Sequence, residues 1–565
     1  MNHIPVITPF IDVLREEFRG YNAQSLRKDF LAGINVAAVA LPLALAFGIA
    51  SGASGAAGLQ TAILAGLVIG LLSGIPNQVS GPTGAMSAVL LVVSKQHHLP
   101  GVWITTLLAG IIIFMIGILR LGRVVMLIPR PVINGFTSGI AVIIFVGQIH
   151  NWLGVVPAQG TTAFLKISEY FSRWQAGQMS INWETLLLAV LVVGIIFGMP
   201  KRVTKVVPAS LIGVAVATGL ALGLGWQLPE VKEVPHGLFL DQRLALNSET
   251  LALVPTLIGP ALSVAILCVL QALLSGAVCN NLTGRRMEND NELIAHGIFN
   301  IISPFVGGVP ATGAVARTKV GIASGGQTRF TTIIHGAVLL AVVLLLGRLI
   351  EHIPLAALAG VLIVTTIRMS DWQDIRWMFR HRFKSAVGAF LLTLAATTVF
   401  DLTNAILLGV GLSLAAFVAR SSTISVSHSD INVKLLEQRG HRLDQLKDAQ
   451  EFTSVAYVTG ALFFGSAATF RRAFEGTLGT QKKVLILSMR GVSLIDLAGL
   501  ELIEELWEKQ KKRGGELLLC SMQPAVRQIF DRAHVTSEIG EQNFFWSADQ
   551  AILAVAMRAP EIKSH

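Results

Sequence analysis

A run of 65 consecutive residues, 30–94, contains no Lys, Arg, Asp or Glu. A helix needs about 20 mostly apolar residues to cross the hydrocarbon core of a bilayer, so this run is too long for one helix. Gly, Ser and Pro interrupt it, and further charge-free runs follow as far as residue 419. The first 420 residues are therefore expected to form a bundle of membrane-spanning helices.

Cutting the charge-free runs at their turn residues predicts fourteen spans, two of them short. They are expected near residues 30–50, 57–74, 82–94, 101–119, 131–149, 183–199, 206–226, 253–277, 291–306, 311–322, 330–350, 354–367, 385–400 and 402–419.

The charges separate the chain into two regions. Residues 1–420 hold 27 Lys and Arg against 17 Asp and Glu, whereas residues 421–565 hold 17 of each. An ordinary soluble domain has about 25% charged residues, which only the second region approaches. A soluble enzyme, a disordered chain and a nucleic-acid binder are excluded, because the basic excess lies among apolar spans. The three cysteines have no CxxC spacing, so neither a metal site nor a disulfide framework is expected.

The loops between the expected spans alternate in charge. With the N-terminus in the cytoplasm, the basic loops fall on the cytoplasmic side, as the positive-inside rule requires. Their basic residues are Arg120, Arg123, Arg130, Lys201, Arg202, Lys205, Arg285, Arg286, Arg376, Arg380, Arg382 and Lys384. Segment 1–29 lacks the apolar core of a signal peptide. An even number of spans places residues 421–565 in the cytoplasm as well.

A short motif occurs twice. The third span begins at Ser80-Gly81-Pro82-Thr83-Gly84-Ala85-Met86-Ser87, and the tenth at Val309-Pro310-Ala311-Thr312-Gly313-Ala314-Val315-Ala316. Both read Thr-Gly-Ala-apolar-small, and each begins a helix of only about 12 residues. The copies are seven spans apart, and an odd offset inserts the second copy upside down, as in the inverted repeats of secondary transporters.

Two short helices that begin near the bilayer midplane favour an anion site between them. The first amides of a helix have no intrahelical acceptor, and its dipole places roughly half a positive charge at the N-terminus. Small residues let these amides approach an ion. The alternative is that each motif only kinks a buried helix; two matched copies favour the site.

Arg317 lies four residues after Gly313 in apolar surroundings. A charged residue inside the membrane is costly and is usually functional or paired. We therefore expect Arg317 beside the anion site. The alternative is that it snorkels toward cytoplasmic lipid phosphates, since Lys319 follows closely.

These segments resemble the SulP anion transporters, bacterial relatives of the solute-carrier-26 family. The likeness covers essentially the whole chain. It rests on DFLAGINVAAVALPLALAFGIASG at 29–52, SGPTGAMSAV at 80–89, NELIAHGIFNIISPFVGGVPATGAVARTKVGIASGGQT at 291–328 and the soluble region that follows the spans.

The resemblance implies a seven-plus-seven inverted repeat divided into core and gate domains, in the bacterial plasma membrane, with many members forming homodimers. It places the substrate between the third and tenth spans. The residues expected at the site are Phe47, Thr83, Gly84, Ala85, Gln271, Ser275, Gly313, Ala314, Val315, Ala316 and Arg317. Packing against lipid or core residues is the alternative for Phe47.

The eighth span departs from the family pattern at Gln271. Cation- or proton-coupled relatives carry a carboxylate there, and an amide is neither an anionic sodium ligand nor a titrating group. Residues 30–168 and 250–287 contain no acidic side chain. Exchange or uniport is therefore favoured over coupling to a cation. An acidic ligand from elsewhere, such as Glu351 or Asp401, has no support in the sequence, because both lie at predicted outer ends of spans.

The last region resembles a STAS domain, expected at 452–565 after a linker at 421–451. Strands are predicted at 484–487 and 517–520, and helices at 496–512 and 524–533. Phosphorylation at the loop that begins the first helix is not expected, because Asp496-Leu497-Ala498-Gly499 has no hydroxyl. A structural or dimer-packing role is favoured over nucleotide sensing.

The sequence therefore predicts a polytopic secondary transporter, with no enzymatic activity and no cofactor, that carries an inorganic anion such as sulfate, bicarbonate or chloride. Its expected partners are the anion, the lipid bilayer and a second copy of the chain, without nucleic acid. Three alternatives stay open: an anion channel, a dicarboxylate transporter, and a signalling scaffold anchored in the membrane.

Overall fold

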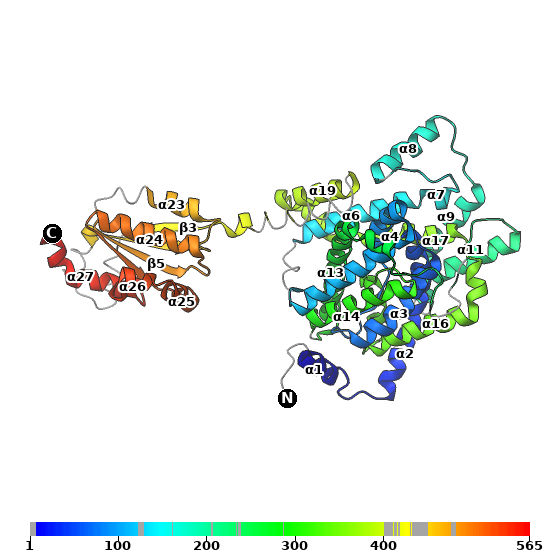
Figure 1. The fold of residues 1–565 in the computed structure, drawn as a ribbon, viewed down its shortest axis with the longest axis horizontal. Helices are drawn as coiled ribbons and strands as arrows, with labels where there is room; N and C mark the ends of the chain where they lie inside the picture. Colours follow the sequence, from blue (N-terminus) through cyan, green and yellow to red (C-terminus); the bar gives the residue numbers. More distant parts are fainter. Residues whose placement is uncertain are drawn as a thin grey trace. The chain divides into compact units, whose positions relative to one another are not determined.

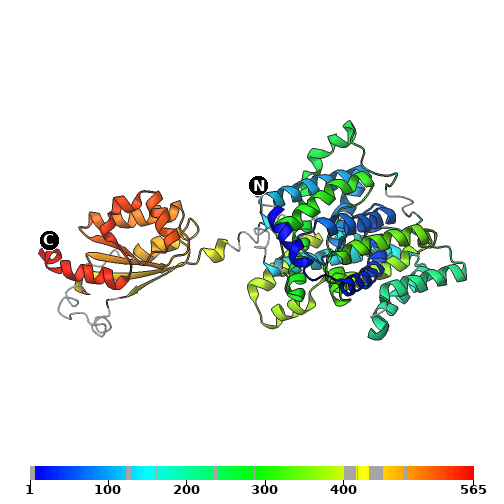
Figure 2. The ribbon, with the colours of Figure 1, turned by 90° about the horizontal axis from the view of Figure 1, so that it is seen from below.

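The computed structural model describes the chain apart from residues 1–6, 123–128, 161, 205–206, 233, 235–238, 286, 400–410, 412–414, 416–417, 430, 432–449, 476–481 and 565. The chain divides into two compact units, residues 1–413 and 414–565. Figures 1 and 2 show a bundle of helices in the first unit and a sheet covered by helices in the second.

The first unit is helical. Its elements are α1 (Ile7–Glu17), α2 (Ala23–Ala50), α3 (Gly55–Leu72), β1 (Ser80–Gly81), α4 (Gly84–Ile118), α6 (Arg130–Gly147), α7 (Ile149–Leu153), α8 (Ala163–Gln175), α9 (Trp183–Gly198), α10 (Lys201–Thr204), α11 (Ala209–Leu224), α12 (Ser248–Ala252), α13 (Val254–Thr283), α14 (Asn289–Ile302), η1 (Ser303–Val306), β2 (Thr312–Gly313), α15 (Val315–Ala323), α16 (Phe330–Glu351), α17 (Leu355–Met369), α18 (Trp372–Arg380) and α19 (Lys384–Val399).

The helices occur where the charge-free runs predicted them. Every expected span from 30–50 to 385–400 overlaps a helix, while most of 402–419 lies outside the described residues. Among the described residues, seven helices are long and apolar enough to cross a membrane, and α9, α11 and α19 are shorter apolar helices. The exact count of fourteen spans stays a prediction.

Of the two short spans, one agrees with the expectation and the other differs in detail. Residues 82–94 and 101–119 both lie in α4, which consists of two helical segments separated at the non-helical residue His98 (φ 54°, ψ −162°), as expected. The tenth span was expected from residue 311, yet α15 begins only at Val315 because Thr312 and Gly313 are extended as β2. Thr312 and Gly313 are extended because they pair with β1, and the sequence around residue 312 alone does not show that this partner strand lies beside it.

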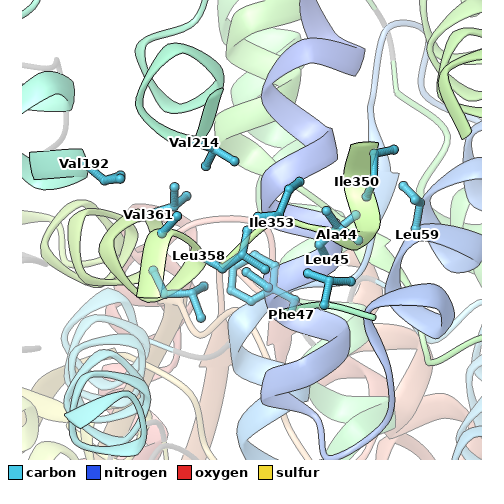
Figure 3. Close-up of a cluster of buried hydrophobic side chains, with 14 of the residues drawn as sticks. Ala44, Leu45, Phe47, Leu59, Val192, Val214, Ile350, Ile353, Leu358 and Val361 are labelled. Atoms are coloured by element: carbon cyan, nitrogen blue, oxygen red, sulfur yellow. The ribbon is translucent and has the colours of Figure 1, made fainter. Parts of the chain in front are cut away.

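Two clusters of buried apolar side chains hold the bundle together. One joins α2, α3, α9, α11, α16 and α17, and Figure 3 shows part of it around Phe47 and Leu358. The other joins α4, α6, α13 and α14. Helices α2 and α3 cross so closely that a Cβ on Gly58 would lie 2.0 Å from the Ala44 carbonyl oxygen. Small residues permit such backbone contacts, which stabilise helix pairs in membranes.

The second unit is an α/β domain. Its elements are β3 (Ser425–Ser429), β4 (Thr453–Thr459), α23 (Ala467–Glu475), β5 (Val484–Gly491), α24 (Leu497–Lys512), β6 (Glu516–Cys520), α25 (Pro524–Arg532), α26 (Val535–Ile539), η3 (Glu541–Asn543), β7 (Phe544–Phe545) and α27 (Ala548–Ser564). The strands form one sheet in the order β3-β4-β5-β6-β7, with β3 antiparallel to β4 and the other neighbours parallel.

Alternation along β5 explains how both faces of this sheet are covered. Leu485 and Leu487 pack with α23, α24 and α25, whereas Val484 and Ile486 pack with α27. The expected strands and helices therefore occur with small shifts in their ends. One expectation is wrong: residues 425–429 are not linker, because they form the edge strand β3 through pairing with β4.

Candidate functional site

The two copies of the repeated motif meet. Strands β1 and β2 are antiparallel, with Ser80 opposite Gly313 and Gly81 opposite Thr312. Each strand leads directly into a helix, β1 into α4 and β2 into α15. The N-termini of two helices from opposite halves of the bundle are thereby brought together.

Both helix starts leave their first amides open. The side chains of the N-cap residues, Thr83 for α4 and Ala314 for α15, accept no hydrogen bond from the helix amides. The amides of the following residues point away from their own helix, where no intrahelical acceptor exists. Gly84 and Ala85 in α4 and Val315 and Ala316 in α15 add only small or apolar side chains around them.

A cavity of about 1220 Å³ adjoins these helix starts. Of the residues expected at the site, it is lined by Phe47, Thr83, Gly84, Ala85, Gln271, Gly313, Ala314, Val315, Ala316 and Arg317. Ser275 does not line it: this side chain is fully buried, with its Oγ 3.1 Å from Thr318 Oγ1. It packs behind α15.

Gln271 and Thr83 are partners. The Thr83 hydroxyl donates to Gln271 Oε1 over 2.9 Å. The carbonyl end of the amide is therefore used within the protein, and its NH₂ group is the end left for another acceptor. Gln271 thus offers the cavity a hydrogen-bond donor, which suits an anion.

Arg317 extends from α15 to the other copy of the motif. Its side chain is 1% exposed, and Nη2 donates to the Pro82 carbonyl oxygen at 2.5 Å. Nη1 is buried with no hydrogen-bond partner among the described residues. A Cβ on Gly81 would lie 2.3 Å from Nη1, so the guanidinium needs glycine at that position. The positive charge is held between the two motifs.

Phe47 has both roles that the sequence left open. It is 5% exposed and belongs to the apolar cluster of α2, where Figure 3 shows it near Leu358. It also lines the cavity, and its ring would lie 3.0 Å from a Cβ on Gly84. Its ring therefore forms a wall beside the first residue of α4.

The cavity is richer in positive than in negative charge. Arg130, Arg317, Lys319 and Arg368 line it on the basic side, and Asp371 and Asp374 on the acidic side. Basic walls of low-dielectric clefts concentrate anions.

Sequence reasoning missed a buried polar network around Glu292. This side chain of α14 is 0% exposed and accepts hydrogen bonds from the Ser73 hydroxyl and, over 2.9 Å, from Gln78 Nε2. His296, one turn later, lies with Nδ1 3.2 Å from Glu292 Oε1. Glu292 lies within the expected span 291–306, but one acidic residue at the end of an apolar span gave no indication of its buried contacts. Its i,i+4 spacing to His296 was the available signal.

A second set of missed residues ties segment 7–29 to the bundle. Glu17 forms a buried ion pair with Arg329, with Oε2 2.8 Å from Nη2. Asp29 accepts hydrogen bonds from the backbone and hydroxyl of Thr328 and from Tyr21. Burial and the Asp29 carboxylate raise the pKa of Tyr21 to about 12. These contacts fix the loop between α15 and α16.

Known proteins resemble this chain along nearly its whole length. The family model described as "Sulfate permease family" matches residues 26–394, and the STAS domain model matches residues 446–551. The putative sulfate transporter YvdB of Bacillus subtilis is 31% identical over 94% of this chain and 98% of its own length. The bicarbonate transporter BicA of Picosynechococcus is 30% identical over 80% of this chain and 81% of its own length.

Solved structures agree in fold. The structure of SLC26A9 covers 99% of this chain and 94% of its own, with a TM-score of 0.85 and 18% identity. The transmembrane domain of a cyanobacterial BicA covers 67% of this chain and 98% of its own, with a TM-score of 0.60 and 29% identity. These likenesses confirm the expected resemblance, and the chain belongs to the sulfate permease (SulP) family of multi-pass membrane transporters and carries a STAS domain.

Proposed function

We propose that the protein is a secondary transporter of a small inorganic anion, held between the N-termini of α4 and α15 and moved by alternating access. The observation that carries this proposal is the antiparallel pairing of β1 with β2, which joins two uncapped helix N-termini at a cavity. Relatives named for transport of sulfate and of bicarbonate support the substrate class.

Three sources of positive potential meet at this place. Each helix N-terminus contributes roughly half an elementary charge. Arg317 contributes a full charge, held by Pro82, and Gln271 contributes a neutral donor. An anion is therefore attracted without a bound cation, which favours exchange or uniport over sodium symport.

The cavity also suggests which side of the membrane is open. Besides the helix starts, it is lined by Arg130, Thr204 and Arg368, close to the basic loops that the positive-inside rule places in the cytoplasm. Residues of the long loops at 154–182 and 227–247 are absent from its described lining. We infer an inward-facing arrangement, with both ends of the chain in the cytoplasm.

The seven-plus-seven repeat, with a fourteenth span at 402–419, belongs to this proposal, as do the boundaries 1–29 and 30–420. The expected boundary at 452 is replaced by an earlier one, because β3 (Ser425–Ser429) belongs to the sheet of the second unit. We also propose a homodimer in which the STAS domain packs rather than switches. An anion channel and a dicarboxylate transporter remain alternatives. A signalling scaffold explains less, because an anchor needs neither a cavity nor paired helix starts.

Uptake by purified full-length protein in proteoliposomes tests the proposal. Labelled sulfate, bicarbonate, chloride and a dicarboxylate are offered with and without sodium gradients, counter-anions and a membrane potential. We expect saturable uptake of an inorganic anion that responds to a counter-anion or to the potential but not to sodium. Strong sodium stimulation contradicts the coupling proposal, and currents far above transporter turnover favour a channel.

A further inference from the structure

We propose that Lys95, His150 and Lys166 form a second anion-binding site, which takes a small inorganic anion such as sulfate or chloride. None of the three residues belongs to the described lining of the cavity beside α4 and α15. The existence of this site does not depend on the proposed function, whereas its position on the outer face of the membrane rests on the topology proposed above.

Helix α8, which carries Lys166, turns its apolar side chains outward. Phe164, Phe171 and Trp174 are exposed, whereas Lys166 is only 8% exposed. Figure 1 shows α8 at the edge of the helical bundle. The only lysine of α8 is therefore covered by the protein, although the aromatic side chains of the same helix are not. This is the reverse of the usual arrangement in a soluble amphipathic helix, in which the charged face is exposed.

The covered ammonium of Lys166 is unpaired. Among the described residues it has neither a hydrogen-bond acceptor nor an ion-pair partner. An ammonium group has three donors, and a buried charge is normally paired or hydrogen-bonded. Burial and, next, the Lys95 ammonium lower the pKa of Lys166, because both disfavour its charged form. An anion supplied from outside the chain would stabilise this group.

The acidic residue of α8 does not serve Lys166. Glu169 accepts hydrogen bonds from the backbone amides of Gln159, over 2.8 Å, and Gly160, over 3.1 Å, and it forms an ion pair with Arg173. Its carboxylate is therefore used by other donors. The charged group that acts on Lys166 is the Lys95 ammonium, and no carboxylate offsets it.

Helix α8 folds back onto the segment that follows α7. The Tyr170 hydroxyl accepts a hydrogen bond from the Ala158 amide over 3.1 Å, and Arg173 Nη1 donates to the Val156 carbonyl oxygen over 3.0 Å. These contacts hold α8 close to α7, the short helix that carries the half-buried His150. The Lys166 ammonium acts electrostatically on the His150 ring, so the two basic groups are neighbours.

Lys95 reaches the same place from α4. Helix α6, which leads directly into α7, packs against both α4 and α8. Val93 of α4 and Ile144 of α6 belong to one buried apolar cluster, so the end of the first segment of α4 lies near the end of α6. Lys95, two residues after Val93, is exposed and acts electrostatically on both His150 and Lys166. Basic groups from three helices therefore converge.

An anion removes the repulsion within this cluster. It accepts hydrogen bonds from the two ammonium groups, and its negative charge offsets theirs. The exposed Lys95 leaves the cluster accessible to solvent, whereas the covered Lys166 provides a cation that water screens little. On the outer face, under the alternating access proposed above, such a site raises the local concentration of anions on the side from which the cavity would be filled.

The rate at which an N-hydroxysuccinimide ester labels Lys95 in the purified full-length protein, measured by peptide mass spectrometry, tests the proposal. Only an unprotonated amine reacts, and a bound anion stabilises the ammonium form. When sulfate or chloride replaces gluconate at constant ionic strength, labelling of Lys95 should slow by about threefold or more. Lys166→Gln should abolish this protection. Lys232, exposed in the other long loop, is the matched control and should show no protection.

A second measurement decides if Lys166→Gln does not fold. Arg317→Ala, in which the cavity site is weakened, should still bind labelled sulfate, and adding Lys95→Gln should weaken that binding severalfold. In right-side-out vesicles, a membrane-impermeant ester applied outside should label Lys95; labelling only after the vesicles are opened overturns the outer position.

Three results overturn the second site. They are equal labelling of Lys95 in sulfate, chloride and gluconate, protection that persists in Lys166→Gln, and protection that is lost in Arg317→Ala, which would come from the cavity instead. Each of these leaves the transporter proposal intact. Protection of Lys95 without uptake of either anion contradicts the transporter proposal for these anions and supports the second site.

Discussion

The two copies of the Thr-Gly-Ala motif have nearly the same sequence and different surroundings. Thr83 is the N-cap of α4 and lines the cavity, whereas Thr312 lies within β2 and is fully buried. Both hydroxyls donate to α13, one turn apart: Thr83 to the Gln271 side chain and Thr312 to the Cys268 backbone oxygen. A similar sequence thus places a threonine in the cavity lining in one copy and a fully buried threonine within a strand in the other.

The second copy carries a positive charge, Arg317, that has no counterpart in the first copy. Counting from the threonine, Arg317 occupies the place of Ala88 in the first copy. It crosses to the first copy at Pro82, so the fixed positive charge of the site comes from α15 while its carbonyl partner comes from the segment before α4. The two copies of the motif therefore contribute different groups to the candidate site.

We expect the largest change in anion affinity when Gln271, the hydrogen-bond partner of Thr83 in the first copy, is replaced by an acidic residue. Gln271→Glu places a carboxylate against Thr83 and removes the NH₂ donor, so it should repel the anion and weaken binding by more than about 100-fold, or create dependence on pH or a cation. Anion binding and uptake across a pH and sodium series measure this. Unchanged affinity would show that Gln271 does not face the anion.

Removing the charge that the second copy contributes should have the next largest effect. Arg317→Ala should weaken anion affinity by about 5- to 150-fold, equivalent to roughly 1–3 kcal/mol for hydrogen bonds from a charged group. Arg348→Ala, which removes an exposed arginine of α16 outside the described cavity lining, is the control and should change affinity little. A folded Arg317→Ala protein with normal affinity would refute the role of the guanidinium.

Replacing each threonine in turn separates the two environments. Thr83→Val should weaken anion affinity severalfold with little loss of stability, because it frees Gln271 at the cavity. Thr312→Val should lower stability by about 1–2 kcal/mol, because it removes the buried hydrogen bond from the Thr312 hydroxyl to the Cys268 carbonyl oxygen, and should affect affinity less. Thermal unfolding and sulfate binding of both variants measure the contrast; equal effects on both would mean that the copies are equivalent.

We expect the smallest effect on anion affinity in the second unit, where the Asp496 carboxylate at the start of α24 is already hydrogen-bonded to two backbone amides. Asp496 accepts from the Gly499 amide over 2.9 Å and from the Phe464 amide over 3.1 Å, so Asp496→Ala should destabilise the STAS domain by about 1 kcal/mol through loss of the helix cap. Anion affinity should stay unchanged. We also expect no phosphate at residues 496–499, which phosphopeptide mapping checks; regulatory phosphate elsewhere in the domain would contradict a purely packing role.

The sequence predicted the positions of helices and strands better than it predicted which strands pair with one another. Charge-free runs located the helices because a charge in hydrocarbon is costly, and this constraint acts on each segment alone. Short continuous apolar runs, 484–487 and 517–520, located β5 and β6 for a similar local reason. Residues 425–429 were taken for linker because an edge strand that is mostly exposed has no apolar alternation, and only the partner β4 makes it a strand.

The candidate site shows the same limit. Ten of the eleven expected residues line the cavity, because two matched motifs and one buried arginine are visible in the sequence. Ser275 points behind α15 instead, and Glu292 with His296 were missed, since the sequence does not show which side of a nearly uniform apolar helix faces which neighbour.

By itself, the sequence determined a membrane-embedded helical region, a repeated Thr-Gly-Ala motif and a STAS domain, because hydrophobic length, charge distribution and the motif are properties of the chain. Only the tertiary structure decided that β1 pairs with β2, that Arg317 bonds Pro82 and that Glu292 bonds Gln78. Each of these contacts joins residues more than 200 positions apart, and their formation depends on how the helices pack rather than on the preference of any one segment.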